Sequence, residues 1–134
     1  MYMTKFRRAK KILNTYKKNF KILKYNNIDL FFVSDLDNIG YFSTIDPKKK
    51  YIGISIEYIL INDLSLLHYT INHEITHVFD YLFNNGWRLD NSGNIIYHDE
   101  KFYLLFKLIT KKIKNKLKEN YKIIIPNKNK KNYV

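Results

Sequence analysis

The stretch LSLLHYTINHEITHVFDYLFNN, residues 64–85, contains no glycine or proline and repeats its apolar residues at spacings of three and four. This spacing is typical of a helix with one buried side. Asn62 or Asp63 can cap its first turn, and Gly86 is a stop signal. We therefore predict one long helix from about residue 64 to residue 84 or 85, buried through Leu66, Leu67, Ile71, Ile75, Val78, Phe79 and Leu82.

Inside this helix, residues 73–77 read HEITH, which is an HExxH motif. Helix residues four apart lie on one face, one turn above each other, so His73 and His77 can bind the same zinc ion. Glu74 lies at the rim of that face, where a carboxylate can take a proton from a metal-bound water. The alternative is a helix whose histidines are only polar neighbours in the core.

A catalytic zinc site needs three protein ligands and an open position for water. Because the chain has no cysteine, the third ligand must be His, Asp or Glu. His68 is five residues before His73, about 140° around the helix, so it faces elsewhere. His98 follows a loop long enough to turn back toward the helix. We predict His98 as the third ligand, ahead of Asp99 and Glu100, because imidazole suits zinc better.

Asp80 lies three residues after His77 and therefore on the same helix face. Its carboxylate can orient a ligand imidazole by accepting the second ring N–H. It can equally pair with a lysine on the helix surface. Both interpretations stay open at this stage.

The flanking sequence predicts the remaining elements. Residues 4–25 form an amphipathic helix with a basic outer face, and a last helix begins around Asp99. Three short runs between them, 28–33, 39–45 and 51–58, are rich in β-branched and aromatic residues, and a turn at Asp46-Pro47 joins the last two as a hairpin. We predict one domain over residues 1–120 and a basic tail or short strand over residues 121–134.

The composition suits a soluble, intracellular protein of the cytoplasm or nucleus. No run of about 18 apolar residues predicts a membrane span, and no apolar segment of a secretory signal follows the basic N-terminus. The net charge of +12 favours a polyanionic partner, of which DNA is the obvious candidate. The abundance of Lys, Asn and Ile is also what an AT-rich coding sequence produces, and the compact size fits a viral or mobile-element origin.

Three segments together resemble the SprT-like zinc metallopeptidases, the family that includes the Spartan-type proteases of DNA-crosslinked proteins. They are residues 39–58, similar to the family's hairpin; residues 70–78, TINHEITHV, similar to its active-site helix; and residues 97–102, YHDEKF, similar to its third-ligand motif. The similarity spans about residues 30–109. The family often has Gly where this chain has Asp99, and its Cys-rich zinc ribbon has no counterpart in a chain without cysteine.

The resemblance implies an α+β, zincin-like minimal metallopeptidase domain. This fold has an N-terminal helix, a small three-stranded, mostly antiparallel sheet, the HExxH helix and a C-terminal helix. His73, His77 and His98 would bind Zn²⁺, Glu74 would be general base and then acid, and Phe102 would pack behind the site.

The function expected is that of a zinc metalloendopeptidase, a hydrolase that acts on a protein or peptide substrate. The substrate is expected to lie extended along an edge of the sheet, and residues 51–58 are the expected edge strand. The alternative is a basic nucleic-acid-binding domain whose zinc is structural and is closed by Asp80 or Asp99 as fourth ligand. Other zincin arrangements use a later glutamate, here Glu119, which is too far along the chain, or a His-x-x-x-His-x-x-Asp pattern like that of residues 73–80.

Overall fold

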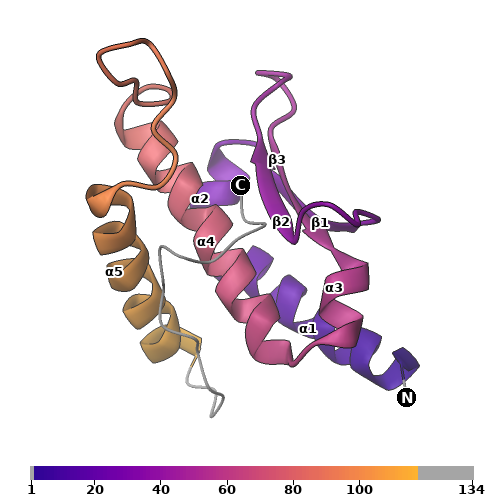
Figure 1. Cartoon of the computed structure of the whole chain (residues 1–134). Coiled ribbons are helices and arrows are strands. Elements are labelled where there is room, and N and C mark those ends of the chain that lie inside the picture. Colours follow the sequence, from indigo (N-terminus) through magenta and orange to yellow (C-terminus); the bar gives the residue numbers. More distant parts are fainter. Residues whose placement is uncertain (1, 118–134) are drawn as a thin grey trace.

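The computed structural model describes residues 2–117 and is an α+β structure with a small mixed sheet (Figure 1). The predicted tail at residues 121–134 lies outside the described residues. The elements, in chain order, are α1 (Tyr2–Asn19), α2 (Lys21–Tyr25), β1 (Asp29–Val33), β2 (Gly40–Ser43), β3 (Tyr51–Ser55), α3 (Ile56–Ile61), α4 (Leu64–Phe83) and α5 (Glu100–Leu117).

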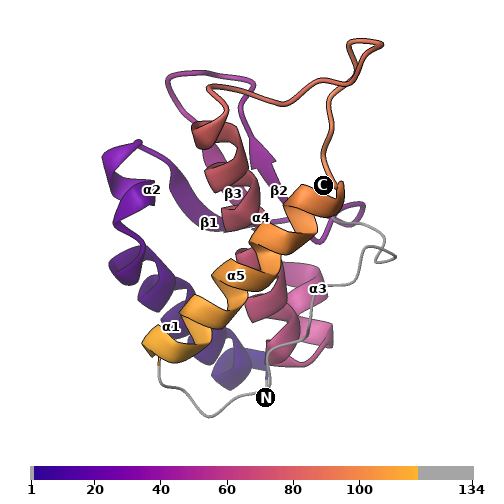
Figure 2. The same ribbon diagram turned by 90° about the vertical axis from the view of Figure 1, so that its left-hand side faces the viewer.

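Helix α4 is the central element of the structure. It runs between the sheet on one side and α5 on the other (Figure 1), and it packs against α5, β2 and β3. Turning the molecule shows α5 crossing in front of α4, with α1 and α2 beside them (Figure 2). As predicted, the helix begins after Asp63, whose carboxylate accepts a hydrogen bond from the Ser65 backbone N–H, and it ends near Gly86. The HExxH residues therefore lie in the middle of the molecule.

The sheet has the strand order β1-β3-β2, with β1 parallel and β2 antiparallel to β3. The prediction of a mostly antiparallel sheet is therefore wrong for the pairing of β1 with β3 and correct for the pairing of β2 with β3. The reason lies in the loop 34–39, which does not turn back as a hairpin. Its start is tied to α3, because Glu57 accepts hydrogen bonds from the Ser34 hydroxyl and the Asp35 backbone N–H. The chain then returns on the far side of β3.

Two further sequence predictions are corrected at element ends. The strand expected over residues 51–58 stops at Ser55, whose hydroxyl caps α3 by accepting the Tyr58 N–H. The helix expected over residues 4–25 is divided at Phe20, whose φ of −106° and ψ of 84° are not helical. Since β3 is the central strand, residues 51–58 do not form the sheet edge that was expected to receive a substrate.

The main core lies between the sheet and α4. Leu30, Ile52 and Ile54 from the sheet are fully buried, together with Leu67, Ile71 and Ile75 of α4. Strand β2 comes close to the helix because Gly40 has no side chain: a Cβ there would lie 2.5 Å from Cγ2 of Thr70 and 3.5 Å from Cγ of Glu74. Glycine at this position thus brings the sheet edge against the HExxH turn.

A second, polar contact joins α1 to α4. The Tyr16 hydroxyl donates a hydrogen bond to Oδ1 of Asn72 at 2.8 Å and lies 3.0 Å from Nδ1 of His68. His68 is therefore a core residue on the side of α4 that faces α1. Its position around the helix predicted only that it would face away from His73. Burial lowers the pKa of His68 to about 4 from 6.5. Among residues 2–117, no helix combines the length and apolar character that crossing a membrane would require.

The buried His68 predicts a pH-dependent stability. Because its pKa is lower in the folded state, the unfolded chain binds more protons between pH 6.5 and 4, and stability is lost as the pH falls through that window. The metal-free parent should lose about 2 kcal/mol more unfolding free energy than His68→Gln between pH 7 and pH 4.5. Urea unfolding in excess chelator measures this difference. Equal losses in the two proteins would contradict it.

Candidate metal centre

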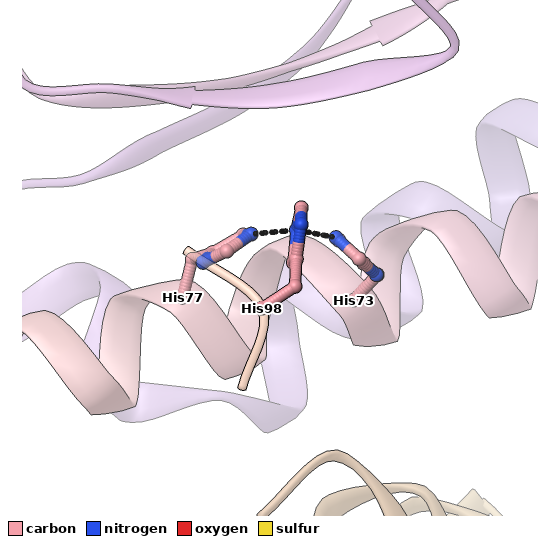
Figure 3. Close-up of side chains that lie close together, drawn as sticks. All are labelled: His73, His77 and His98. Atoms are coloured by element: carbon pink, nitrogen blue, oxygen red, sulfur yellow. Dashed lines mark hydrogen bonds between the residues drawn. The ribbon is translucent and has the colours of Figure 1, made fainter. Parts of the chain in front are cut away.

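Three histidines converge on one point beside α4. His73 and His77 come from successive turns of the helix, and His98 comes from the end of the loop that leads into α5 (Figure 3). The Nε2 atom of His98 lies 3.0 Å from Nε2 of His73 and 3.1 Å from Nε2 of His77. The three ligand atoms lie within 4.8 Å of one another. The structure therefore brings together the three metal ligands that the sequence predicted.

This arrangement fits a cation better than it fits hydrogen bonds alone. A neutral imidazole nitrogen either donates one proton or accepts through one lone pair. The Nε2 of His98 faces two other Nε2 atoms, so it cannot make a good hydrogen bond to both at once. Zinc bound by three imidazoles at about 2.0–2.1 Å would separate their nitrogens by about 3.3 Å in tetrahedral geometry, close to the two distances measured from Nε2 of His98. The three residues could hold a metal ion.

Burial disfavours the protonated form of two of these histidines. It lowers the pKa of His73 well below its usual value, and the neighbouring charges of His77 and His98 lower it further. Burial also lowers the pKa of His98. An imidazole must be neutral to coordinate a metal, so the protein interior favours the ligand form of these two rings over the cationic form.

Glu74 is fully buried beside the first of these histidines. Neither of its carboxylate oxygens has a hydrogen-bond partner among the described residues. Burial raises the pKa of this carboxyl well above its ordinary value. A buried carboxylate without partners is costly, and such a group in a native structure points to an absent cation or water. Glu74 is therefore a buried carboxyl with a raised pKa, directly beside the histidine cluster.

Aromatic rings surround the three histidines. The fully buried Phe102 packs against all of them, with ring centroids 5.0 Å from His73, 4.4 Å from His77 and 5.0 Å from His98. This is the packing position that the resemblance implied for Phe102. Tyr97 and Tyr103 lie on either side of the third histidine in the sequence, with ring centroids 6.3 and 6.2 Å from its ring. Tyr97 is exposed and Tyr103 is half-buried. Neither ring was assigned a role from the sequence, because only the fold brings both of them beside the histidines.

An arginine links the two chain segments that carry the ligands. The guanidinium of Arg88 donates to both carboxylate oxygens of Asp80 and to both carboxylate oxygens of Asp99. The hydrogen bonds to Arg88 lower the pKa of Asp99 to about 2 and raise the pKa of the guanidinium itself. Asp80 is also held by the Asn84 side-chain amide. It is thus a buried partner of Arg88, and not the surface acid paired with a lysine that the sequence left open.

The other acidic candidates lie apart from the cluster. Asp99 caps α5 by accepting the Phe102 N–H at 3.0 Å, and Glu100 is exposed in the first helical turn. Glu119 lies outside the described residues. Arg88 had no signal in the sequence, because a lone arginine in a polar loop is usually solvated.

The geometry predicts that metal binding depends on His98 and not on its acidic neighbour. His98→Ala removes one of three ligands and should weaken zinc binding by two orders of magnitude or more, about 3 kcal/mol. Glu100→Ala, two residues away and exposed, should bind zinc as the parent does. Titration calorimetry of the metal-free proteins measures both. Unchanged affinity in His98→Ala would remove this histidine from the site.

The chain matches no protein-family model, no curated protein and no solved structure. The likeness to SprT-like peptidases therefore rests on the three sequence segments alone. What the geometry supports by itself is a buried place where three histidines could hold a metal ion, with one unpartnered carboxylate next to them.

Proposed function

We propose that the protein is a zinc-dependent metallopeptidase in which His73, His77 and His98 hold the metal and Glu74 is the general base. The single observation that carries the proposal is the convergence of three imidazoles beside a buried carboxylate that has no partner among the described residues. A ligand set of three neutral nitrogens without thiolate or clustered carboxylates suits zinc among the common metals. Three protein ligands also match a catalytic site and not a closed structural one.

A zinc ion, when bound, supplies a Lewis acid that polarises a carbonyl group and makes water a nucleophile at neutral pH. The protein's own contribution is made by Glu74. Its carboxylate accepts the proton that the attacking water loses, and the resulting carboxylic acid donates that proton to the leaving amine. The raised pKa of the buried carboxyl suits this role, because a base that is too acidic would not take up the proton.

The sheet edge next to α4 offers a place for an extended substrate. Strand β2 has β3 on one side only, so its other edge is free of strand pairing within the described sheet. Gly40 brings this strand into contact range of Glu74. A peptide that adds to β2 as a further strand would pass beside the proposed base. This assignment replaces residues 51–58, which form the central strand and the start of α3.

The rival function, a nucleic-acid-binding domain with a structural zinc, needs a fourth protein ligand. Asp80 and Asp99 were the candidates, and all four of their carboxylate oxygens accept hydrogen bonds from Arg88. No other His, Asp or Glu of the described chain joins the three-histidine cluster. The donor set therefore favours an open position over a closed coordination shell.

DNA remains a second proposed partner because of the exposed side of α1. Arg7, Lys10, Lys11 and Lys18 line one shallow groove there and are exposed. Replacing Arg7, Lys11 and Lys18 together by Gln should shift elution from immobilised single-stranded DNA to lower salt, because each phosphate contact releases counterions. A triple variant that elutes with the parent would argue against this surface.

The peptidase proposal predicts a clean separation of binding from catalysis. Glu74→Gln removes the proton acceptor but keeps the size of the side chain, so it should bind zinc with parental affinity and lose at least a hundredfold in hydrolysis of fluorescein-labelled casein. Glu100→Gln serves as the matched control and should cleave normally. Hydrolysis by Glu74→Gln at the parental rate would overturn the assignment of the base.

A further inference from the structure

Along the chain, the loop between α4 and α5 separates the third histidine from the other two. Residues 84–99 form this connection, and its internal hydrogen bonds tie residues 88–96 to one another: Leu89 pairs with Ile95 in an isolated bridge, the Ile96 N–H donates to the Arg88 carbonyl at 2.8 Å, and the Asp90 carboxylate accepts the Ser92 and Asn94 N–H groups. These bonds hold the loop together and do not reach α4. Connections of this length are uncommon in compact domains and tend to be conformationally free unless they are tied down. The position of His98 therefore needs a restraint.

Arg88 supplies a restraint of the right geometry. Its Nε and Nη2 donate to Asp80 at 2.9 and 3.1 Å, and its Nη1 and Nη2 donate to Asp99 at 2.7 and 2.8 Å. Both pairs are bidentate, which fixes direction as well as distance. The Arg88 side chain is 16% exposed and the Asp80 side chain 10%, so water competes weakly for that pair, whereas the Asp99 side chain is 34% exposed.

The two carboxylates belong to the two halves of the metal centre. Asp80 lies one helical turn after His77, and Asp99 directly follows His98 along the chain. Asp99 is itself anchored, because its side chain accepts the Phe102 N–H and its carbonyl accepts the Tyr103 N–H at the start of α5. Arg88 thus connects the carboxylate of Asp80, one turn after His77, with the carboxylate of Asp99, the residue after His98.

We propose that Arg88 is a positioning residue for the third metal ligand: by joining Asp80 to Asp99 it holds His98 over the histidine pair of α4. The proposal rests on the proposed metal site, but not on peptidase activity. Partners outside the ligand shell typically change metal affinity by about 10- to 100-fold when they are removed. Arg88 should act within that range without contacting the metal.

The chemistry of the side chain makes the assignment specific. Only a planar guanidinium can donate two parallel hydrogen bonds to each of two carboxylates at once. A lysine in its place would keep the positive charge but bond to the carboxylates as a single point. An uncharged residue would leave two carboxylates facing each other without a cation, which favours separation of the loop from α4.

The test compares Arg88→Met and Arg88→Lys with the parent, using Arg8→Met, at an exposed arginine of α1, as the matched control. Zinc affinity is measured by competition with a chromophoric chelator, and the visible spectrum of the Co²⁺-loaded protein reports the ligand geometry. Arg88→Met should bind zinc about 10- to 100-fold more weakly and show an altered Co²⁺ spectrum. Arg88→Lys should recover part of the affinity, and Arg8→Met should match the parent in both measurements.

A double-mutant cycle with Asp99→Asn separates positioning from general stability. Asparagine can still cap α5, so this variant should fold, but it lacks the charge that holds Arg88. If the two residues act together, the double variant should lose about as much zinc affinity as the weaker-binding single variant. Fully additive losses would overturn the proposal. So would a variant whose melting temperature falls while its zinc affinity and Co²⁺ spectrum stay parental.

The outcomes also separate this proposal from the proposed function. A parent that binds no zinc would overturn both the metal site and the role of Arg88. A parent that binds zinc but cleaves no casein would overturn only the peptidase assignment, because the affinity and spectral measurements do not depend on catalysis. Should Arg88→Met fail to fold, Arg88→Lys and Asp99→Asn carry the test, and parental zinc affinity in both would overturn the proposal.

Discussion

The properties of the site depend on one feature of the fold: the helix face that carries the HExxH motif is buried. His73, Glu74 and His77 lie in the interior between the sheet and α5. Burying such groups is unfavourable unless each finds a partner or a neutral protonation state. The packing of apolar residues on the opposite face keeps the helix in place, and that packing holds the polar residues where water cannot solvate them. The unusual electrostatics of the site follow from this burial.

The same burial acts differently on the two kinds of group, the imidazoles and the carboxyl. Imidazoles respond by remaining neutral, which leaves a nitrogen lone pair available for a cation. Burial raises the pKa of the Glu74 carboxyl, so its carboxylate is a stronger base than that of an exposed glutamate. One environment therefore favours the forms that the proposed ligands and the proposed base need. Groups whose pKa values are shifted in this way commonly mark functional sites, although structural networks also cause such shifts.

The metal centre is assembled from a local part and a distant part with different physical origins. His73 and His77 need only helical geometry to face the same point. His98 needs the loop to return, the Phe102 ring to pack behind it and the hydrogen bonds of Arg88 to connect the loop with α4. The local part is robust because the helix is long and buried. The distant part depends on a few polar contacts, which makes it the part of the site that substitutions can disturb without unfolding the protein.

Periodicity and motif spacing were enough to predict α4, a cap at Asn62 or Asp63, and the pairing of His73 with His77, because a helix fixes the relation between residues three or four apart. His98 was predicted by elimination among the few possible ligands and by the resemblance of its flanking residues, because helix geometry does not reach beyond the loop. The sheet order could not be predicted, since strands pair over long sequence separations and the loop 34–39 is directed by Glu57, a contact with no sequence pattern. The contacts of Arg88 could not be predicted for the same reason, because they join residues far apart in the sequence. Its two carboxylates are 8 and 11 residues away along the chain, and only the folded loop brings both of them to one guanidinium.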